Sequence, residues 1–235
     1  MTSDNASAHH DRLALWILLI VVAITAAVFF WTRANYHQGD TAIATQVDAA
    51  GHLHVLGITL GKTSLKQAEL ILKSQSDVAL YIYPQGHPKA GLKLEAFFPA
   101  IADHTKVILL LDVAAEERKA EKLKAIESRA TIPHLYPNKV ARMNLAPEDF
   151  TQVHDAIVAE LTLIPNLNIS PETLQARFGT PDQILKMDQD RNRYIYNAIG
   201  LDAVVSKEEP PVLHFINPNT AGKNEPQRHK VGSES

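Results

Sequence analysis

The 235-residue chain contains no cysteine. This absence excludes disulfides, thiolate metal ligands, a cysteine nucleophile and an acylated N-terminal cysteine, so the chain is not a lipoprotein. A long basic run is also missing, and 23 Lys and Arg residues against 26 Asp and Glu residues give a formal net charge of −3. We therefore expect no nucleic-acid partner, because such proteins neutralise phosphates with clustered positive charge.

Common enzyme motifs are absent as well. The sequence has no Gly-x-Ser-x-Gly elbow, no His-Glu-x-x-His pair and no glycine fingerprint of a dinucleotide-binding domain. Among the eleven histidines, His52 and His54 would share one face of a strand. No third ligand is near them in sequence, so the set of metal ligands is incomplete. We expect no catalytic residue, no metal and no cofactor.

One long apolar run stands out in an otherwise globular composition of 46% hydrophobic and 21% charged residues. From Leu13 to Trp31 the only polar residue is Thr25, and a helix of this length spans about 29 Å, close to the hydrocarbon core of a bilayer. The alternative is a cleaved signal peptide, but its apolar stretch is shorter and ends at small residues. The sequence therefore predicts an uncleaved transmembrane helix at 13–32.

The flanking charges suggest an orientation for this span. Arg12 and the amino terminus lie on one side, and a single Arg33 lies on the other. Positive charge near the ends of a span favours the cytoplasm, so we expect residues 1–12 there. The C-terminal bulk would then lie in the periplasm of a bacterium, held at the inner membrane through contact of Leu13–Trp31 with the lipid bilayer.

In the rest of the chain, the sequence predicts a tether at 33–47, a folded region, and a disordered tail at 217–235 that is rich in Pro, Gly and charged residues. Apolar spacing predicts the folded elements. These are helices at 63–73, 114–128, 148–161 and 171–178, and strands at 52–57, 77–83, 91–98, 106–112, 183–187, 192–197, 201–206 and 211–216.

One order of elements occurs twice: a helix opened by Ser/Thr-Leu, a Tyr-Ile-Tyr strand, a strand opening with Gly-Leu, and an apolar strand. The matched pairs are Ser64-Leu65 with Thr173-Leu174, Tyr81-Ile82-Tyr83 with Tyr194-Ile195-Tyr196, Gly91-Leu92 with Gly200-Leu201, and Val107–Leu111 with Val212–Ile216. This order favours a tandem duplication. The expected fold class is α+β, with the N-terminal transmembrane helix followed by two small helix-plus-antiparallel-sheet units in tandem, at 48–130 and 166–216, joined by a connecting segment at 131–165 that contains the helix 148–161.

The segment Ser170–Asp182, which includes Phe178-Gly179-Thr180-Pro181, resembles the helix-to-strand junction of SmpA/OmlA-like domains. Residues 167–216 fit the pattern of that family, while 57–112 fit it less well because Leu72-Lys73-Ser74-Gln75 replaces the Phe-Gly-Thr-Pro stop. The family comprises small periplasmic α+β modules of the outer-membrane β-barrel assembly machinery, similar in fold to the repeat of β-lactamase inhibitor proteins. The resemblance implies a fold and binding of envelope proteins, without membership of that complex.

A glycine-containing loop provides an alternative function. Gly57, Gly61, Lys62 and Thr63 lie between an expected strand and an expected helix, and Asp112 ends a downstream apolar strand. A phosphate-binding loop needs four residues between its first glycine and Gly-Lys-Thr, whereas this chain has three. Nucleotide binding or hydrolysis is therefore the second hypothesis, and a turn followed by a helix cap is the favoured interpretation.

Four tyrosines alternate with isoleucine: Tyr81 and Tyr83 in one strand, and Tyr194 and Tyr196 in another. Each pair is expected on one face of its strand. Two interpretations remain open: an exposed aromatic surface that binds a partner, or rings that cover the helix of each unit. We expect a membrane-tethered, non-catalytic protein-binding or scaffold module, whose partner is another envelope protein or a second copy of the chain.

Overall fold

The computed structural model describes residues 43–101, 104–131, 133–188 and 190–221. These residues belong to one compact unit that begins at Ile43. The transmembrane helix expected at 13–32, the first part of the tether and all but the start of the expected tail lie outside the described residues. Within them, no helix has the length and apolar character needed to cross a membrane.

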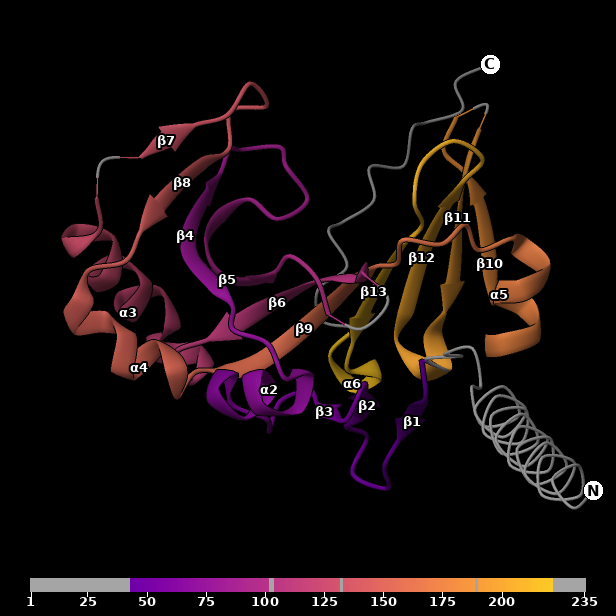
Figure 1. Cartoon of the computed structure of the whole chain (residues 1–235), viewed down its shortest axis with the longest axis horizontal. Helices are drawn as coiled ribbons and strands as arrows, with labels where there is room; N and C mark the ends of the chain where they lie inside the picture. Colours follow the sequence, from indigo (N-terminus) through magenta and orange to yellow (C-terminus); the bar gives the residue numbers. More distant parts are fainter. Residues whose placement is uncertain (1–42, 102–103, 132, 189, 222–235) are drawn as a thin grey trace, which may run out of the picture. The chain divides into compact units, whose positions relative to one another are not determined.

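The elements of the unit are shown in Figure 1. In chain order they are β1 (Thr45–Val47), β2 (Leu53–Val55), β3 (Ile58–Thr59), α2 (Leu65–Leu72), β4 (Asp77–Tyr83), β5 (Gly91–Phe98), β6 (Lys106–Asp112), α3 (Glu116–Arg129), β7 (His134–Leu135), β8 (Ala141–Asn144), the 3-10 turn η2 (Pro147–Asp149), α4 (Phe150–His154), β9 (Ile157–Ile164), α5 (Pro171–Phe178), β10 (Gln183–Lys186), β11 (Arg191–Tyr196), the 3-10 turn η3 (Asn197–Ile199), β12 (Leu201–Ser206), β13 (Val212–Ile216) and α6 (Pro218–Ala221).

A single antiparallel sheet of ten strands dominates the fold. Its order is β10-β11-β12-β13-β9-β6-β5-β4-β8-β7 (Figure 1). The meander β4-β5-β6 lies on one side of β9 and the meander β11-β12-β13 on the other, and β9 pairs with both β6 and β13. The expectation of two small sheets in tandem units is therefore wrong, because β9 joins both meanders into one mixed α/β unit with a large antiparallel sheet.

The helix expected at 148–161 is also corrected, since η2, α4 and the first part of β9 occupy this segment. The apolar spacing that predicts the helix, Phe150, Val153, Ile157 and Leu161, combines two residues of α4 with two of β9, and a β-bulge adds to the helical appearance of β9. The register of β9 against β6 shifts between Leu110 and Leu111, so that Ala159 is an extra residue in β9. As a result, the fully buried residues of β9 are Val158, Leu161 and Leu163, and a step of three followed by a step of two resembles a helical pattern.

The strand expected at 52–57 is shorter in the structure, where β2 covers Leu53–Val55 and a second strand, β3, follows at Ile58–Thr59. Leu56 and Gly57 separate the two strands and have φ angles of 53° and 79°, which turn the chain back on itself. With β1, these strands form a separate three-stranded sheet.

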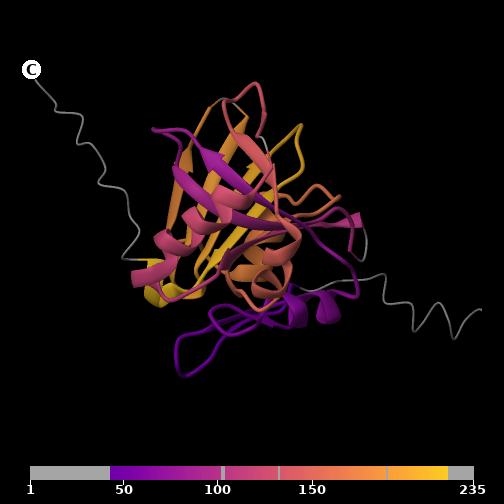
Figure 2. The same cartoon turned by 90° about the vertical axis from the view of Figure 1, so that its left-hand side faces the viewer.

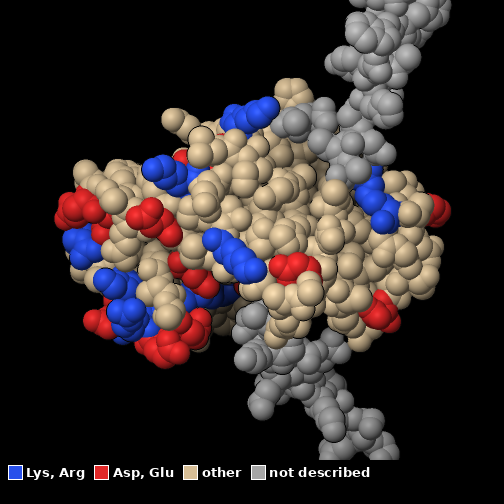
Figure 3. Space-filling model, turned by 90° about the horizontal axis from the view of Figure 1, so that it is seen from below, with Lys and Arg blue, Asp and Glu red and all other residues tan. Residues whose placement is uncertain are grey.

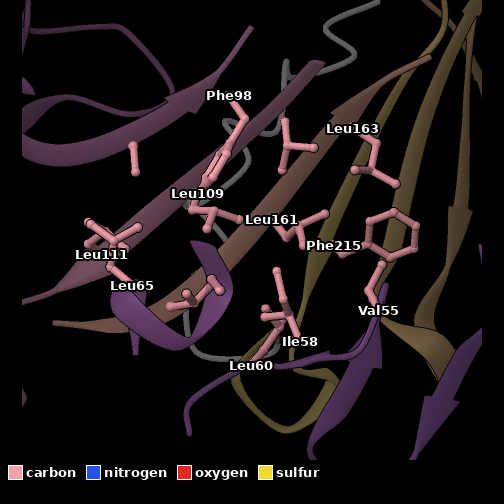
Figure 4. Close-up of a cluster of buried hydrophobic side chains, with 14 of the residues drawn as sticks. Val55, Ile58, Leu60, Leu65, Phe98, Leu109, Leu111, Leu161, Leu163 and Phe215 are labelled. Carbon is pink, nitrogen blue, oxygen red and sulfur yellow. The ribbon is translucent and has the colours of Figure 1, made fainter. Parts of the chain in front are cut away.

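The hydrophobic core lies on one face of the large sheet, beneath α2, α3, α5 and the β1–β3 sheet. Figures 1 and 2 show α2 and β1–β3 together at one end of the unit. In the register of the sheet, the buried residues of one row come from five adjacent strands. They are Ala96, Leu109, Leu161, Phe215 and Leu201. Figure 4 shows part of this cluster, with Val55, Ile58 and Leu60 packed toward the sheet.

The side chain of Asn217 joins the first and last segments of the unit. Its Oδ1 accepts a hydrogen bond from the Leu53 amide at 2.7 Å, and its Nδ2 donates to the Leu60 carbonyl at 3.1 Å. Both termini of the described unit are therefore fixed to the same end of the fold.

Candidate functional site

The glycine loop uses its amide groups in bonds within the protein. Gly61 N–H donates to the Val158 carbonyl at 2.8 Å, and both Lys62 N–H and Thr63 N–H donate to the Thr59 carbonyl, at 3.1 and 2.9 Å. The Thr59 amide in turn donates to Thr63 Oγ1 at 2.9 Å. A phosphate cradle requires free N–H groups that converge on the anion, and these four amides are already taken.

The loop residues instead start α2. Ser64 is the N-cap, and it exchanges hydrogen bonds with Gln67 in a capping box. Gly61 has a φ of 80°, a conformation that glycine adopts readily. Lys62 is half exposed, with its Nζ 3.7 Å from Asp48 Oδ2. These contacts agree with the interpretation of the motif as a turn followed by a helix cap.

The structure brings Asp112 to the same end of the sheet as the loop. Ile157 of β9 pairs with Asp112 on one side and forms a bridge with Ser64 on the other. The Asp112 carboxylate, however, is paired with the ammonium group of Lys119 from α3. Its charge is therefore neutralised within the protein.

The four tyrosines lie on opposite faces of the sheet. Tyr194 and Tyr196 point into the core, with exposed fractions of 7% and 3%, and the Tyr196 ring is 6.0 Å from that of Phe178 in α5. Tyr81 and Tyr83 are half-buried on the other face, with their rings stacked at 6.1 Å. For Tyr194 and Tyr196, the structure supports the alternative in which the rings cover a helix. The four residues do not form one surface.

Tyr83 is the centre of a polar cluster that closes the β4–β5 hairpin. Its hydroxyl donates to Glu95 Oε1 at 2.9 Å, and Lys89 Nζ approaches the same oxygen at 2.9 Å. The His87 ring stacks on Tyr83 at 4.6 Å. Burial raises the pKa of Tyr83, and the charge of Glu95 adds to this effect. Glu95 is only 5% exposed, so the cluster holds the β4–β5 connection against the face of the sheet that carries Glu95.

A second carboxylate lies on the same face, two strands away from Glu95. Glu160 accepts a hydrogen bond at 2.9 Å from Nε2 of His214, on the neighbouring strand β13. Burial opposes ionisation of Glu160, but the His214 hydrogen bond and the charges of Lys89 and Lys93 outweigh it and lower the pKa of Glu160. Glu95 and Glu160 therefore both have cationic or hydrogen-bonding partners. Within the described residues, no group of three metal-ligating side chains is found.

The open edge of the large sheet is β10, and its four residues are all exposed. Ile184 is 59% exposed, and Met187, just beyond the strand, is 53% exposed. Met187 N–H donates to the Arg191 carbonyl of β11 at 3.0 Å. Backbone N–H and C=O groups alternate in direction along a strand, so every second residue before Met187 also directs these groups toward β11. Ile184 and Lys186 consequently direct their N–H and C=O groups outward. Outward N–H and C=O groups of this kind are the groups with which a further strand would pair.

The opposite edge of the sheet is protected. Strand β7 has only two residues, His134 and Leu135, and Pro133 and Pro137 flank it closely. Proline has no N–H to offer a partner strand, and short edge strands pair poorly. Of the two edge strands of the large sheet, β10 is therefore the longer, and its position at the edge could not be read from local sequence.

Comparison with known proteins adds little to this geometry. No protein-family model matches the chain, and no curated protein matches it. Among solved structures, the chain is similar to a DUF4309 family protein, YjgB, from Bacillus subtilis subsp. subtilis str. 168. The TM-score is 0.35 and the identity is 10%, with 71% of this chain and 88% of that chain covered. A likeness this low assigns neither a family nor a function.

Proposed function

We propose that the protein is a membrane-anchored, non-catalytic module that binds a partner protein at the β10 edge. The apolar run Leu13–Trp31 is its anchor in the inner membrane, and the unit from Ile43 onward lies in the periplasm. The observation that carries the binding function is the exposed β10 strand, with apolar side chains and outward backbone groups at the end of a ten-stranded sheet.

Strand addition explains how this edge would recognise a partner. An extended segment of the partner exchanges backbone hydrogen bonds with Ile184 and Lys186, while alternate side chains contact the two faces of the sheet. In the register with β11, Ile184 stands opposite Tyr194 on the core face, and Leu185 stands opposite Arg193 on the other. The best fit is therefore an extended segment with apolar residues on one face, supplied by an envelope protein or by a second copy of the chain.

Two further features support a binding function over a catalytic one. The amides of the glycine loop and the carboxylate of Asp112 are engaged within the protein. In addition, residues 167–216, which resemble SmpA/OmlA-like domains, contain β10. Binding of envelope proteins by that family agrees with the proposal.

A proline substitution tests the proposal directly. Ile184→Pro removes an outward N–H without removing a bond to β11, and Ile184→Thr is the matched control that keeps the N–H. A photo-crosslinking residue placed at Met187 in the full chain reports contact in cells. We expect crosslinks in the parent protein and in Ile184→Thr, and their loss in Ile184→Pro.

The mass of the crosslinked product identifies the partner. A product at twice the chain mass of 25.9 kDa indicates a second copy, and any other mass indicates a different envelope protein. If Ile184→Pro folds and crosslinks as strongly as the parent, the β10 edge is not the binding site.

A further inference from the structure

Helix α2 carries exposed apolar side chains that the core does not use. Its inner face buries Leu65 and Ala68, whereas Leu70 is 72% exposed and Ile71 is 41% exposed. Leu70 has the highest exposed fraction among the exposed large hydrophobic residues of the described chain. The outward face of α2 is therefore available for contact with another apolar surface.

Lysines surround Leu70 on this face. Lys66 precedes Leu70 by four positions and Lys73 follows it by three, a spacing that places all three side chains together. With Glu69, Ser74 and Gln75, they line a shallow, open depression. Glu69 is already engaged, because its Oε1 accepts hydrogen bonds from Ser76 at 2.8 and 3.0 Å. Within the described residues, no ion pair involves Lys66 or Lys73, so their positive charges remain available.

Helix α2 lies at the end of the unit where the described chain begins. Helix α2 and the β1–β3 sheet are at the same end in two perpendicular views (Figures 1 and 2). Figure 3 shows this end from below: uncharged side chains cover most of the middle, single charged side chains of both signs lie among them, and the densest charged group is at one side. The ten residues 33–42 reach at most about 35 Å, which limits how far the start of the unit can lie from an anchor that ends at residue 32.

We propose that the outward face of α2 lies on the membrane and binds anionic phospholipid. This inference rests on the membrane anchor of the proposed function. Leu70 and Ile71 enter the interfacial region of the bilayer, and Lys66 and Lys73 contact lipid phosphates. Tethering raises the effective concentration of the membrane surface, so a contact made by few side chains is sufficient. The contact fixes how the β10 edge is presented to a partner.

The absence of cysteine permits a site-specific test with the full chain. Single variants Leu70→Cys, Ile184→Cys and Ile20→Cys each accept one environment-sensitive fluorophore. Each labelled protein is reconstituted in bilayers of phosphatidylcholine, alone or mixed with phosphatidylglycerol, that contain a lipid quencher. We expect quenching at position 20 in both bilayers, strong quenching at position 70 in the anionic bilayer, and little at position 184 on the β10 edge.

Charge reversal tests the role of the lysines. Lys66→Glu with Lys73→Glu is expected to weaken the contact at position 70 by at least roughly fivefold for each lysine. The matched control, Lys124→Glu with Lys207→Glu, changes the net charge equally at exposed positions on other elements and should leave quenching at position 70 unchanged.

The outcomes separate this inference from the proposed function. Quenching at position 20 without quenching at position 70 overturns the α2 contact and leaves the anchor and the β10 site standing. Absence of quenching at position 20 overturns the anchor, and the α2 contact with it. Equal quenching at position 70 in neutral and anionic bilayers overturns the binding of anionic lipid.

Discussion

Lys62 is the residue at which the binding and nucleotide hypotheses differ most. Because its ammonium group makes only a surface ion pair with Asp48, we expect Lys62→Ala to change the free energy of unfolding by less than about 1 kcal/mol. Mg-ATP should leave the melting temperature of both proteins unchanged, since the nearby amides are engaged. Thermal unfolding of the full chain in detergent, with and without Mg-ATP, measures both effects.

The opposite result would also be clear. A ligand that binds only the native state raises the melting temperature by mass action. An increase with Mg-ATP in the parent, lost in Lys62→Ala, would establish a nucleotide site despite the short loop.

At the residue scale, signals that act locally were readable from the sequence. Gly179 ends α5 with a φ of 84°, and Pro171 opens it, as the local rules predict. The face of each tyrosine was not readable, because it depends on strand pairing and a shift of one residue turns a side chain to the other face. The matched Tyr-Ile-Tyr segments for this reason point in opposite directions, Tyr81 away from the core and Tyr194 into it.

Among the elements, strands joined by hairpins to their sequence neighbours were predictable. The expected boundaries 77–83, 91–98 and 106–112 match β4, β5 and β6. The sequence does not predict β8, because Ala141–Asn144 has no apolar run. This segment becomes a strand by pairing with β4. The place of β10 at the sheet edge was equally hidden, because it follows from the order of all ten strands.

Asn217 lies outside the regular elements and joins the first and last segments of the unit. We expect Asn217→Ala to destabilise the protein by about 1–3 kcal/mol, because the partly buried amide of Leu53 and carbonyl of Leu60 both lose a partner. Asn217→Asp is nearly isosteric but replaces the donor with an acceptor that faces the Leu60 carbonyl, so it should not restore stability. Chemical denaturation of the three proteins measures these differences.

The reverse result has a specific meaning. If Asn217→Asp is as stable as the parent, the hydrogen bond to Leu60 contributes nothing to stability, and the bond from the Leu53 amide accounts for the effect of Asn217→Ala.

For the molecule as a whole, the central position of β9 predicts cooperative unfolding. Leu161 is fully buried in β9, and Leu161→Ala should destabilise the fold by about 2–5 kcal/mol. Because β9 pairs with both meanders, amide hydrogen exchange in β4–β5 and in β11–β12 should accelerate by the same factor. Native-state exchange measured by mass spectrometry tests this expectation, with the exposed Leu135→Ala as the control.

Unequal acceleration would contradict this view of the fold. If only one meander exchanges faster in Leu161→Ala, the two halves unfold independently, and the single sheet then behaves as two units despite its continuous hydrogen bonding.

The central position of β9 also sets the order in which the sheet is completed during biosynthesis. When β6 has been made, its outer edge stays open while the ribosome adds the 44 residues that precede β9, which takes several seconds at roughly 5–20 residues per second. The other edge of β9 then stays open until β13, which ends at Ile216, has been made. A nascent or prematurely terminated chain therefore exposes an unpaired edge in the middle of its future sheet, and its need for protection from aggregation lasts until β13 has been made.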